Sequence, residues 1–242
     1  MEFTEFKALF CNALAENGLQ SPTDGVIELF WRFDAELHRT NAVTNLTAIR
    51  NTPDAIYKHY VDSLLAADLI PQGSRVLDLG CGPGFPSFPL AMLRPDLTIV
   101  ALDSTAKKIA FVEQTAKALG LSNLTGVSGR AEDRALSKKL GSFDVVVSRA
   151  VARMNVLCEL CLPYVKIGGF LLAMKAAKAQ EEADEAKQCI QTLGGAPAQL
   201  LDVALKLGES ESEPRCLIKV EKKKQHPATY PRAYAQILKK PL

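Results

Sequence analysis

The amino-acid sequence predicts an α/β protein with a doubly wound, mostly parallel sheet of the Rossmann-like type, preceded by a helical region. From residue 75 onward, short apolar runs alternate with helical patterns. This alternation is typical of parallel strands joined by crossover helices. The first apolar run also ends in glycines at every second position over 80–84. Buried strands of such sheets end in this way beside a nucleotide-like ligand.

The N-terminal part of the chain has helical patterns. Apolar side chains recur every three or four residues over 3–14 and 26–35, and the polar residues 21–24 separate these two helices. A third helix is predicted over 54–67. The short polar side chains of 40–47 predict an ordered loop between the second helix and the third.

The later elements follow from the alternation. Strands are predicted over 75–79, 98–102, 124–127, 143–147 and 169–174, with helices between them over 86–94, 105–119, 130–140 and 154–165. Two more apolar runs, 199–206 and 215–220, have no helix between them and predict an antiparallel pair. The acid-rich stretch 180–188 has a helical composition.

Composition narrows the class of protein. The chain has 242 residues, a net charge of +2 and six cysteines. No apolar run approaches the roughly 20 residues that a membrane-spanning helix needs. The N-terminus is acidic where a secretory signal is basic. We therefore expect a cytoplasmic monomer with reduced thiols and no membrane partner. We divide it into a helical region (1–70), a ligand-binding core (71–222) and a basic tail (223–242) packed on or beside the core.

The basic tail allows two interpretations. From residue 222 onward there are six lysines or arginines and no acid. They are Lys222, Lys223, Lys224, Arg232, Lys239 and Lys240. Such a local cluster favours a polyanionic partner at one face of the protein. A solvated, frayed C-terminus is the alternative.

The glycine loop distinguishes between two ligand classes. A dinucleotide fold requires G-x-G-x-x-G/A, because its third small residue lets helix and strand pack closely. Counted from Gly80, that position is Phe85, and the spacing is G-x-G-x-G instead. S-adenosylmethionine has no pyrophosphate, so its loop needs backbone room for the methionine part rather than a phosphate cradle. The loop therefore favours S-adenosylmethionine over a dinucleotide.

Polar residues follow the next strands at the same edge of the sheet. Asp103 ends the second strand, where a carboxylate accepts both ribose hydroxyls of a nucleoside. With Ser104 and Thr105 it is equally suited to cap the following helix. Ala131 and Glu132 follow the third strand, where they would contact an adenine ring or form the first turn of a helix.

The fourth and fifth strands each end in a cation. Arg149 follows a buried strand at the edge where doubly wound sheets bind ligands. There it would contact a carboxylate, a base or a phosphate, or form a surface ion pair. Lys175 is a candidate phosphate contact at the same edge, with a structural role as the alternative.

Two cysteines have metal-like spacing. Cys158 and Cys161 form C-x-x-C, but zinc needs two more ligands at a suitable spacing. The pair also lies within an apolar helical pattern rather than after a strand. We interpret both as core residues and expect no metal.

Several segments, taken in order, resemble the ribosomal RNA small subunit methyltransferase G family, also called glucose-inhibited division protein B. They are NLTAI at 45–49, KH at 58–59, DSL at 62–64, DLGCGPGFP at 78–86, LDS at 102–104, RAE at 130–132, FD at 143–144, SRA at 148–150 and YPR at 230–232. The resemblance covers nearly the whole chain. It implies a class I S-adenosylmethionine-dependent methyltransferase fold with an N-terminal helical region.

The resemblance also implies an activity. It is methylation of the N7 of a specific guanine in 16S ribosomal RNA, with S-adenosylmethionine as donor and S-adenosylhomocysteine as product. The partner would be the 30S subunit or an assembly intermediate. By position, the donor contacts fall on Gly80, Phe85, Asp103, Ser104, Ala131, Glu132 and Arg149, to which we add Gly82 and Thr105. RNA contacts are expected at Asn45, His59, Arg149, Lys175 and Arg232.

Two of these RNA candidates have structural alternatives. Asn45 also suits a turn, and His59 a helix position satisfied by an acid such as Asp62. Methyl transfer to N7 requires alignment but no general base, because that nitrogen carries no proton. Accordingly the chain has no Asp/Asn-Pro-Pro-Tyr motif after the fourth strand and no Pro-Cys dipeptide. We therefore name no catalytic residue.

The chain departs from the family pattern at three places. Ser87 and Ala176 stand where glycine is common, and the tail after 230–232 lacks the usual Pro-Gly. A methyltransferase of the same fold that acts on another RNA or a small molecule is one alternative. A non-catalytic ribosome-assembly factor is another, but the glycine loop and Asp103 are intact.

Overall fold

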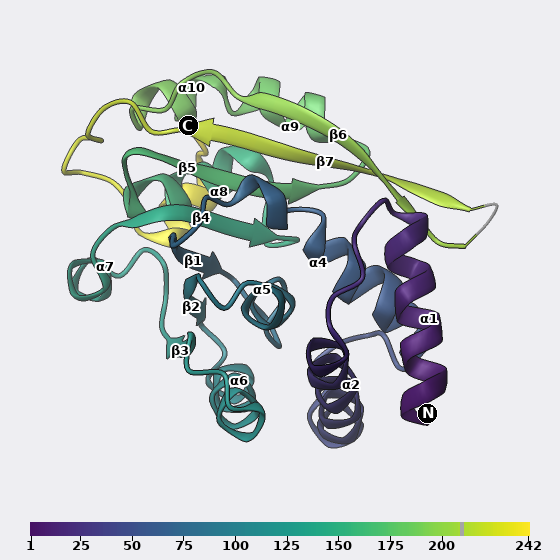
Figure 1. The fold of residues 1–242 in the computed structure, drawn as a ribbon. Helices are drawn as coiled ribbons and strands as arrows, with labels where there is room; N and C mark the ends of the chain where they lie inside the picture. Colours follow the sequence, from purple (N-terminus) through teal and green to yellow (C-terminus); the bar gives the residue numbers. More distant parts are fainter. Residues whose placement is uncertain (209–210) are drawn as a thin grey trace.

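A seven-stranded sheet forms the centre of the protein, in the order β3-β2-β1-β4-β5-β7-β6 (Figure 1). The computed structural model describes residues 1–208 and 211–242. The strands are β1 (Arg75–Leu79), β2 (Thr98–Asp103), β3 (Leu124–Ser128), β4 (Phe143–Arg149), β5 (Val165–Lys175), β6 (Gln199–Lys206) and β7 (Ser212–Glu221). The first five are parallel, and β7 runs antiparallel to both β5 and β6. The predicted fold class is confirmed, including the antiparallel pair.

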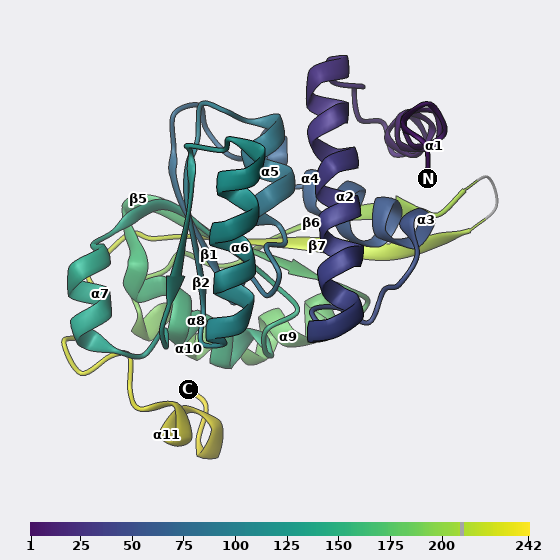
Figure 2. The same cartoon turned by 90° about the horizontal axis from the view of Figure 1, so that it is seen from below.

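Helices cover both faces of the sheet (Figures 1 and 2). In chain order they are α1 (Phe3–Glu16), α2 (Asp24–Thr44), α3 (Thr52–Ala55), the π-helical η1 (Ile56–Val61), α4 (Asp62–Leu64), the 3₁₀ turn η2 (Ala67–Leu69), α5 (Ser87–Leu93), α6 (Ala106–Leu119), α7 (Arg134–Leu140), α8 (Met154–Cys161), the 3₁₀ turn η3 (Leu162–Tyr164), α9 (Ala179–Glu185), α10 (Lys187–Thr192) and α11 (Tyr234–Lys239). Among the described residues, no helix has both the length and the apolarity needed to cross a bilayer.

The sheet separates two hydrophobic clusters. Along β4, Val145 and Val147 face one cluster and Val146 faces the other, because successive side chains of a strand point to opposite faces. The first cluster contains residues of α1, α2, η1, α5 and α6. The second contains residues of α8, α9 and α10. Both faces of the central strands are therefore buried, which explains their continuous apolar runs.

The N-terminal helices pack onto the core through aromatic rings. Phe33 of α2 is fully buried, and its ring centre lies 4.4 Å from that of Phe88 and 5.7 Å from that of Phe85. The ring centre of Tyr60 in η1 lies 5.8 Å from that of Phe33 and 6.0 Å from that of Phe85. These contacts place η1 directly beside the end of β1, where the glycine loop begins.

Two N-terminal predictions need correction. Residues 40–44 belong to α2 rather than to a loop, because Asn41 is buried in the last turn and its side chain binds both the backbone N–H and the C=O of Thr47. The helix then ends at Asn45 in the left-handed conformation, with φ of 50°. The helix expected over 54–67 is divided into short α, π and 3₁₀ segments.

Smaller differences concern the ends of later helices. The helix predicted over 154–165 ends at Cys161, and a 3₁₀ turn containing Pro163 follows. The helix predicted from residue 130 begins at Arg134, after Asp133 caps it through the N–H groups of Ala135 and Leu136. The acid-rich stretch 180–188 lies across α9 and α10.

Candidate functional site

A pocket of about 460 Å³ opens at the carboxyl ends of β1, β2 and β4. This is the edge at which doubly wound sheets bind ligands, and the volume suits a nucleoside-sized molecule. The structure brings together ten of the predicted residues there: Gly80, Gly82, Phe85, Asp103, Ser104, Thr105, Ala131, Glu132, Arg149 and His59.

The glycines of the loop have two different roles. All three have positive φ, with 77° at Gly80, 56° at Gly82 and 101° at Gly84. A Cβ on Gly80 would lie 2.3 Å from Val151, and one on Gly84 would lie 2.3 Å from Phe88. A Cβ on Gly82 would meet no atom within 4 Å. Gly80 and Gly84 therefore permit close packing, whereas Gly82 leaves its backbone open to a ligand in the pocket.

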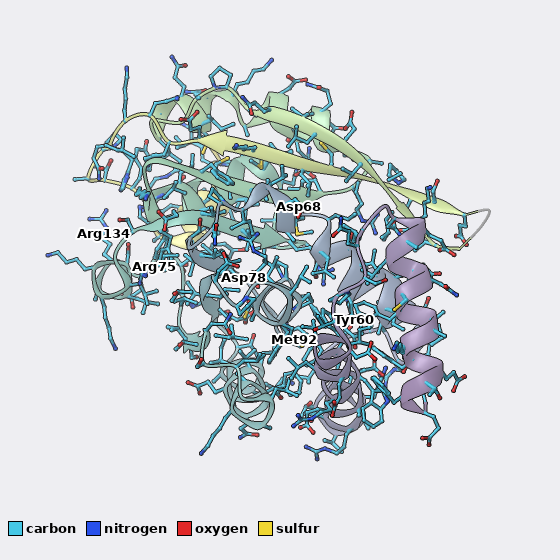
Figure 3. All side chains as sticks on the ribbon, in the orientation of Figure 1. Tyr60, Asp68, Arg75, Asp78, Met92 and Arg134 are labelled. Carbon is cyan, nitrogen blue, oxygen red and sulfur yellow. The ribbon has the colours of Figure 1, made fainter. Side chains whose placement is uncertain are left out.

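A buried carboxyl lies beneath the loop. Asp78 is fully buried in β1, next to α5, and its Oδ2 accepts hydrogen bonds from both the N–H and the hydroxyl of Ser87 (Figure 3). Burial raises the pKa of Asp78 to about 7, and the bonds from Ser87 oppose that rise. Its Oδ1 has no partner among the described residues. Ser87, a departure from the family pattern, thus holds the carboxyl in place.

Asp103 organises the glycine loop. Its Oδ2 accepts a hydrogen bond from the N–H of Gly82 at 3.0 Å, and its Oδ1 accepts one from the N–H of Thr105 at 2.8 Å. Helix α6 begins one residue after Thr105, so Asp103 shapes the turn before the helix rather than capping it. Each carboxylate oxygen accepts more than one hydrogen bond, which leaves acceptor capacity for ribose hydroxyls.

Ala131 and Glu132 lie in the loop before α7, not in its first turn. The carbonyl of Ala131 accepts a hydrogen bond from the buried hydroxyl of Tyr164 at 2.9 Å. This bond fixes the loop through which Ala131 and Glu132 line the pocket. The interpretation of the pair as a helical first turn is therefore wrong.

Arg149 and His59 meet above the ring of Phe85. The imidazole stacks on this ring with centres 4.3 Å apart, and the Arg149 guanidinium lies 5.3 Å from the ring centre. Burial, with the nearby charge of Arg149, lowers the pKa of His59 to about 3. His59 is therefore neutral. Its Nδ1 lies 3.3 Å from an Arg149 nitrogen and accepts from it, and its Nε2–H donates to the Thr47 hydroxyl at 2.8 Å.

Asp62 connects two arginines that are distant in the sequence. Its Oδ2 binds Arg149 at 2.8 Å, and its Oδ1 binds Arg215 of β7 at 2.7 Å. The alternative that pairs Asp62 with His59 is therefore wrong. Sequence analysis did not identify Arg215, because only the fold brings β7 beside α4. It also missed Tyr234 of α11, which lines the pocket.

Three predicted RNA contacts lie outside the pocket lining. Asn45 ends α2, as its turn interpretation expects. The Lys175 side chain is 9% exposed, and its Nζ lies 2.7 Å from Glu182. Arg232 binds the fully buried carboxylate of Glu159 at 2.6 Å. The charges of Lys175 and Arg232 are thus already paired within the protein.

The predicted core cysteines lie where the apolar pattern indicated. Cys158 and Cys161 are fully buried in the second hydrophobic cluster. Burial raises the pKa of both thiols. Within 1–208 and 211–242, no group of three or more His, Cys, Asp or Glu side chains is arranged to hold a metal ion.

Solved structures resemble this fold at low sequence identity. A precorrin-6y C5,15-methyltransferase from Geobacter metallireducens matches with a TM-score of 0.50 and 17% identity, over 75% of this chain and 92% of that chain. Trm5b from Pyrococcus abyssi matches with a TM-score of 0.52 and 13% identity, over 71% of this chain and 50% of that one. Both likenesses concern the fold alone.

Sequence comparisons identify the family. The family model for rRNA small subunit methyltransferase G matches residues 26–209. A ribosomal RNA small subunit methyltransferase G from Clostridium botulinum is 38% identical over 98% of this chain and 99% of its own length. The enzyme of the same name from Brevibacillus brevis is 40% identical over 98% and 99%. This chain belongs to the rRNA small subunit methyltransferase G family.

Proposed function

We propose that this protein transfers a methyl group from S-adenosylmethionine to the N7 of a guanine in 16S ribosomal RNA. The observation that carries the proposal is the pocket at the carboxyl edge of the sheet. It combines an open glycine backbone, a carboxylate with free acceptor capacity and an arginine beside a neutral imidazole. Membership in the methyltransferase G family supplies the identity of the acceptor.

The donor fits the described pocket. The open backbone at Gly82 would receive its amino-acid part, and Asp103 would accept its ribose hydroxyls. Ala131 and Glu132 would border its adenine. When bound, the donor supplies a methyl group activated by a sulfonium. The protein then needs to orient the guanine and exclude water, and no residue has to remove a proton from N7.

Arg149 and His59 are suited to the acceptor side. Asp62 and the Lys58 carbonyl fix the Arg149 guanidinium, so its remaining N–H groups keep one direction. Phe85 supports both side chains from below. The fixed N–H groups of Arg149 can donate hydrogen bonds to the edge of a purine base, and a flat aromatic surface beside them can contact its face. We therefore propose that these residues position the guanine.

Exposed cations near the pocket would bind the RNA backbone. Arg130 lines the pocket with a side chain that is 67% exposed, and Lys239 and Lys240 are exposed at the C-terminus. By contrast, Lys222 is buried and donates to the Leu162 carbonyl. We propose a 30S subunit or its precursor as the partner, in the cytoplasm. The expectation of a monomer stays a prediction.

The test is methyl transfer with a matched pair of glycine variants. Purified protein, labelled S-adenosylmethionine and 30S particles from a strain without the family enzyme should yield 7-methylguanosine in 16S RNA. Gly82→Val should abolish transfer, because the side chain would occupy the open backbone position. Gly25→Ala should not, since Gly25 lies in α2 with no atom within 4 Å of the added Cβ. No labelled guanine with the wild-type protein would refute the proposal.

A further inference from the structure

The C-terminal segment 229–242 reaches the donor pocket. The chain leaves the sheet at the end of β7, and this segment then ends with α11, which packs against α8. Figure 2 shows α11 beyond the helices of that face, far from the N-terminal helices. The segment lies past residue 209, the end of the region that the family model matches. One of its side chains, Tyr234, lines the same pocket as the glycine loop.

A buried ion pair holds this segment in place. Glu159 of α8 has no exposed surface, and its carboxylate accepts hydrogen bonds from the side chain and the backbone N–H of Arg232. A buried carboxylate is strongly unfavourable without such a partner. Further along, Ile237 is fully buried in the second hydrophobic cluster. These contacts dock the segment, so the interpretation of a frayed C-terminus is wrong.

Tyr234 lies on the side of the pocket opposite His59 and Phe85. It is half-buried and packs against the second hydrophobic cluster, to which Ala131 and Leu160 belong. Both of these residues also line the pocket. His59 and Phe85 border the pocket from the first cluster's side. Tyr234 therefore borders the pocket from the side of the second cluster, as Ala131 and Leu160 do.

We propose that Tyr234 is a donor-binding residue that covers the nucleoside of S-adenosylmethionine, and that the Arg232–Glu159 pair positions it. This inference rests on the proposed function, since it takes S-adenosylmethionine as the donor. An aromatic ring offers a large apolar face at a low cost in side-chain entropy, and nucleobases stack well on such a face. The tyrosine hydroxyl has no role in this arrangement.

Binding of S-adenosylhomocysteine, measured by calorimetry, tests Tyr234 directly. Tyr234→Ala should raise Kd about tenfold, as expected for the loss of one base-stacking ring. Tyr234→Phe should bind within twofold of wild type, because the ring is kept. Leu238→Ala is the matched control: Leu238 lies in the same helix but is 53% exposed and does not line the pocket. A Kd for Tyr234→Ala within twofold of wild type would overturn the inference.

The positioning role of Arg232 needs a second readout. Arg232→Ala should raise Kd by about the same factor as Tyr234→Ala, and the double variant should be no weaker than either single variant. Additive losses would mean that Arg232 does not act through Tyr234. Should Arg232→Ala fail to fold, the wild-type protein suffices. S-adenosylhomocysteine should then slow amide hydrogen exchange in 234–239, and unchanged exchange there would contradict the proposal.

Binding of S-adenosylhomocysteine distinguishes a failure of the proposed function from a failure of the role assigned to Tyr234. If the wild-type protein does not bind S-adenosylhomocysteine at all, the proposed function fails. If the wild-type protein binds it and Tyr234→Ala binds equally well, the donor site stands and only the role of the C-terminal segment is refuted.

Discussion

The two ends of the chain both reach the pocket, but different forces hold them there. The N-terminal wall consists of η1 and the residues after α2, and it packs through the buried rings of Phe33, Tyr60 and Phe85. The C-terminal wall is the segment 229–242, fixed chiefly by the ion pair between Arg232 and buried Glu159. One wall is therefore a continuation of the hydrophobic core, whereas the other combines a buried ion pair with the buried side chain of Ile237.

The difference has a physical consequence. Aromatic packing is distributed over many contacts, so it stabilises the whole fold together with the pocket. A buried ion pair contributes little compared with apolar residues of similar volume, but the loss of one partner is costly. Changes in the N-terminal wall should therefore lower global stability most. The loss of stability caused by a substitution in the C-terminal wall should depend strongly on which partner of the ion pair it removes.

The largest effect is expected where the N-terminal wall packs against α2. Phe33→Ala should lower the free energy of unfolding by about 4 kcal/mol, because it leaves a cavity among fully buried rings. Urea denaturation followed by circular dichroism measures it. Val43→Ala is the control, since Val43 is 81% exposed in the same helix and should change stability by less than about 0.5 kcal/mol. Equal losses in the two variants would contradict the packing described here.

Substitutions in the C-terminal wall should lower the unfolding free energy nearly as much, but only where they remove the charged partner of buried Glu159. Arg232→Ala leaves the Glu159 carboxylate buried without its charged partner and should cost about 3 kcal/mol of unfolding free energy. Arg134→Ala is the matched control: this arginine also holds the segment, through the Thr229 carbonyl, but it is exposed (Figure 3). Its removal should cost less than about 1 kcal/mol. Similar losses would show that burial of Glu159 is not decisive.

Acid should weaken the N-terminal wall through His59. Its pKa in the folded protein is about 3 against 6.5 for the free side chain, so between these values the unfolded chain binds a proton that the folded protein excludes. This stability is complete above pH 6.5 and is lost as the pH falls, by up to about 1.4 kcal/mol per pH unit. His59→Gln should make the fall between pH 7.5 and 4.5 less steep in urea titrations.

Asp78 has the opposite effect on the pH dependence of stability, so its variant must be measured beside that of His59. The pKa of Asp78 in the folded protein, about 7, lies above the usual 3.8 of this side chain, so its burial destabilises the folded protein progressively as the pH rises between these values. Asp78→Asn should therefore steepen the loss of stability on acidification. Just before the C-terminal wall, burial and the charge of Lys222 lower the pKa of His226 as well. If His226→Gln changed the pH dependence of stability as much as His59→Gln does, acid sensitivity would not be a distinguishing property of the N-terminal wall.

The smallest effect on stability is expected at the exposed tail lysines. The double variant Lys239→Gln with Lys240→Gln should fold normally but bind 16S RNA with a weaker dependence on salt. The slope of log K against log salt should shrink by about 0.7 for each single-strand phosphate contact removed. Lys7→Gln, on the N-terminal α1, is the control. An unchanged slope in the tail variant would place the RNA elsewhere.

The sequence predicted the core of this protein well. All seven strands lie within a few residues of their apolar runs, and the local signal is strongest for central strands such as β1 and β4, which are buried on both faces. The glycine loop and Asp103 lie together in the pocket for the same reason, since each directly follows such a strand. The alternation of strands and helices also brought Arg149 to the correct edge.

Features that depend on distant contacts were not predictable from local patterns. Arg232 and Lys175 looked like free cations, but their partners Glu159 and Glu182 lie on other elements. The π-helical η1 carries no recognisable local signature. Tyr234 reaches the pocket because contacts distant in sequence dock its helix, namely the Arg232–Glu159 pair and the burial of Ile237 in the second cluster. Contacts between residues distant in sequence determine where these side chains lie, and the spacing of residue types along the chain does not reveal such contacts.

The most direct test of this account is a crystal structure of the protein with S-adenosylhomocysteine. We expect the ribose hydroxyls to bind Asp103, the adenine to lie between Ala131 and the ring of Tyr234, and the sulfur to face Arg149 and His59. A ligand bound away from the Gly82 backbone, or an adenine that leaves Tyr234 untouched while the C-terminal segment stays docked, would contradict it.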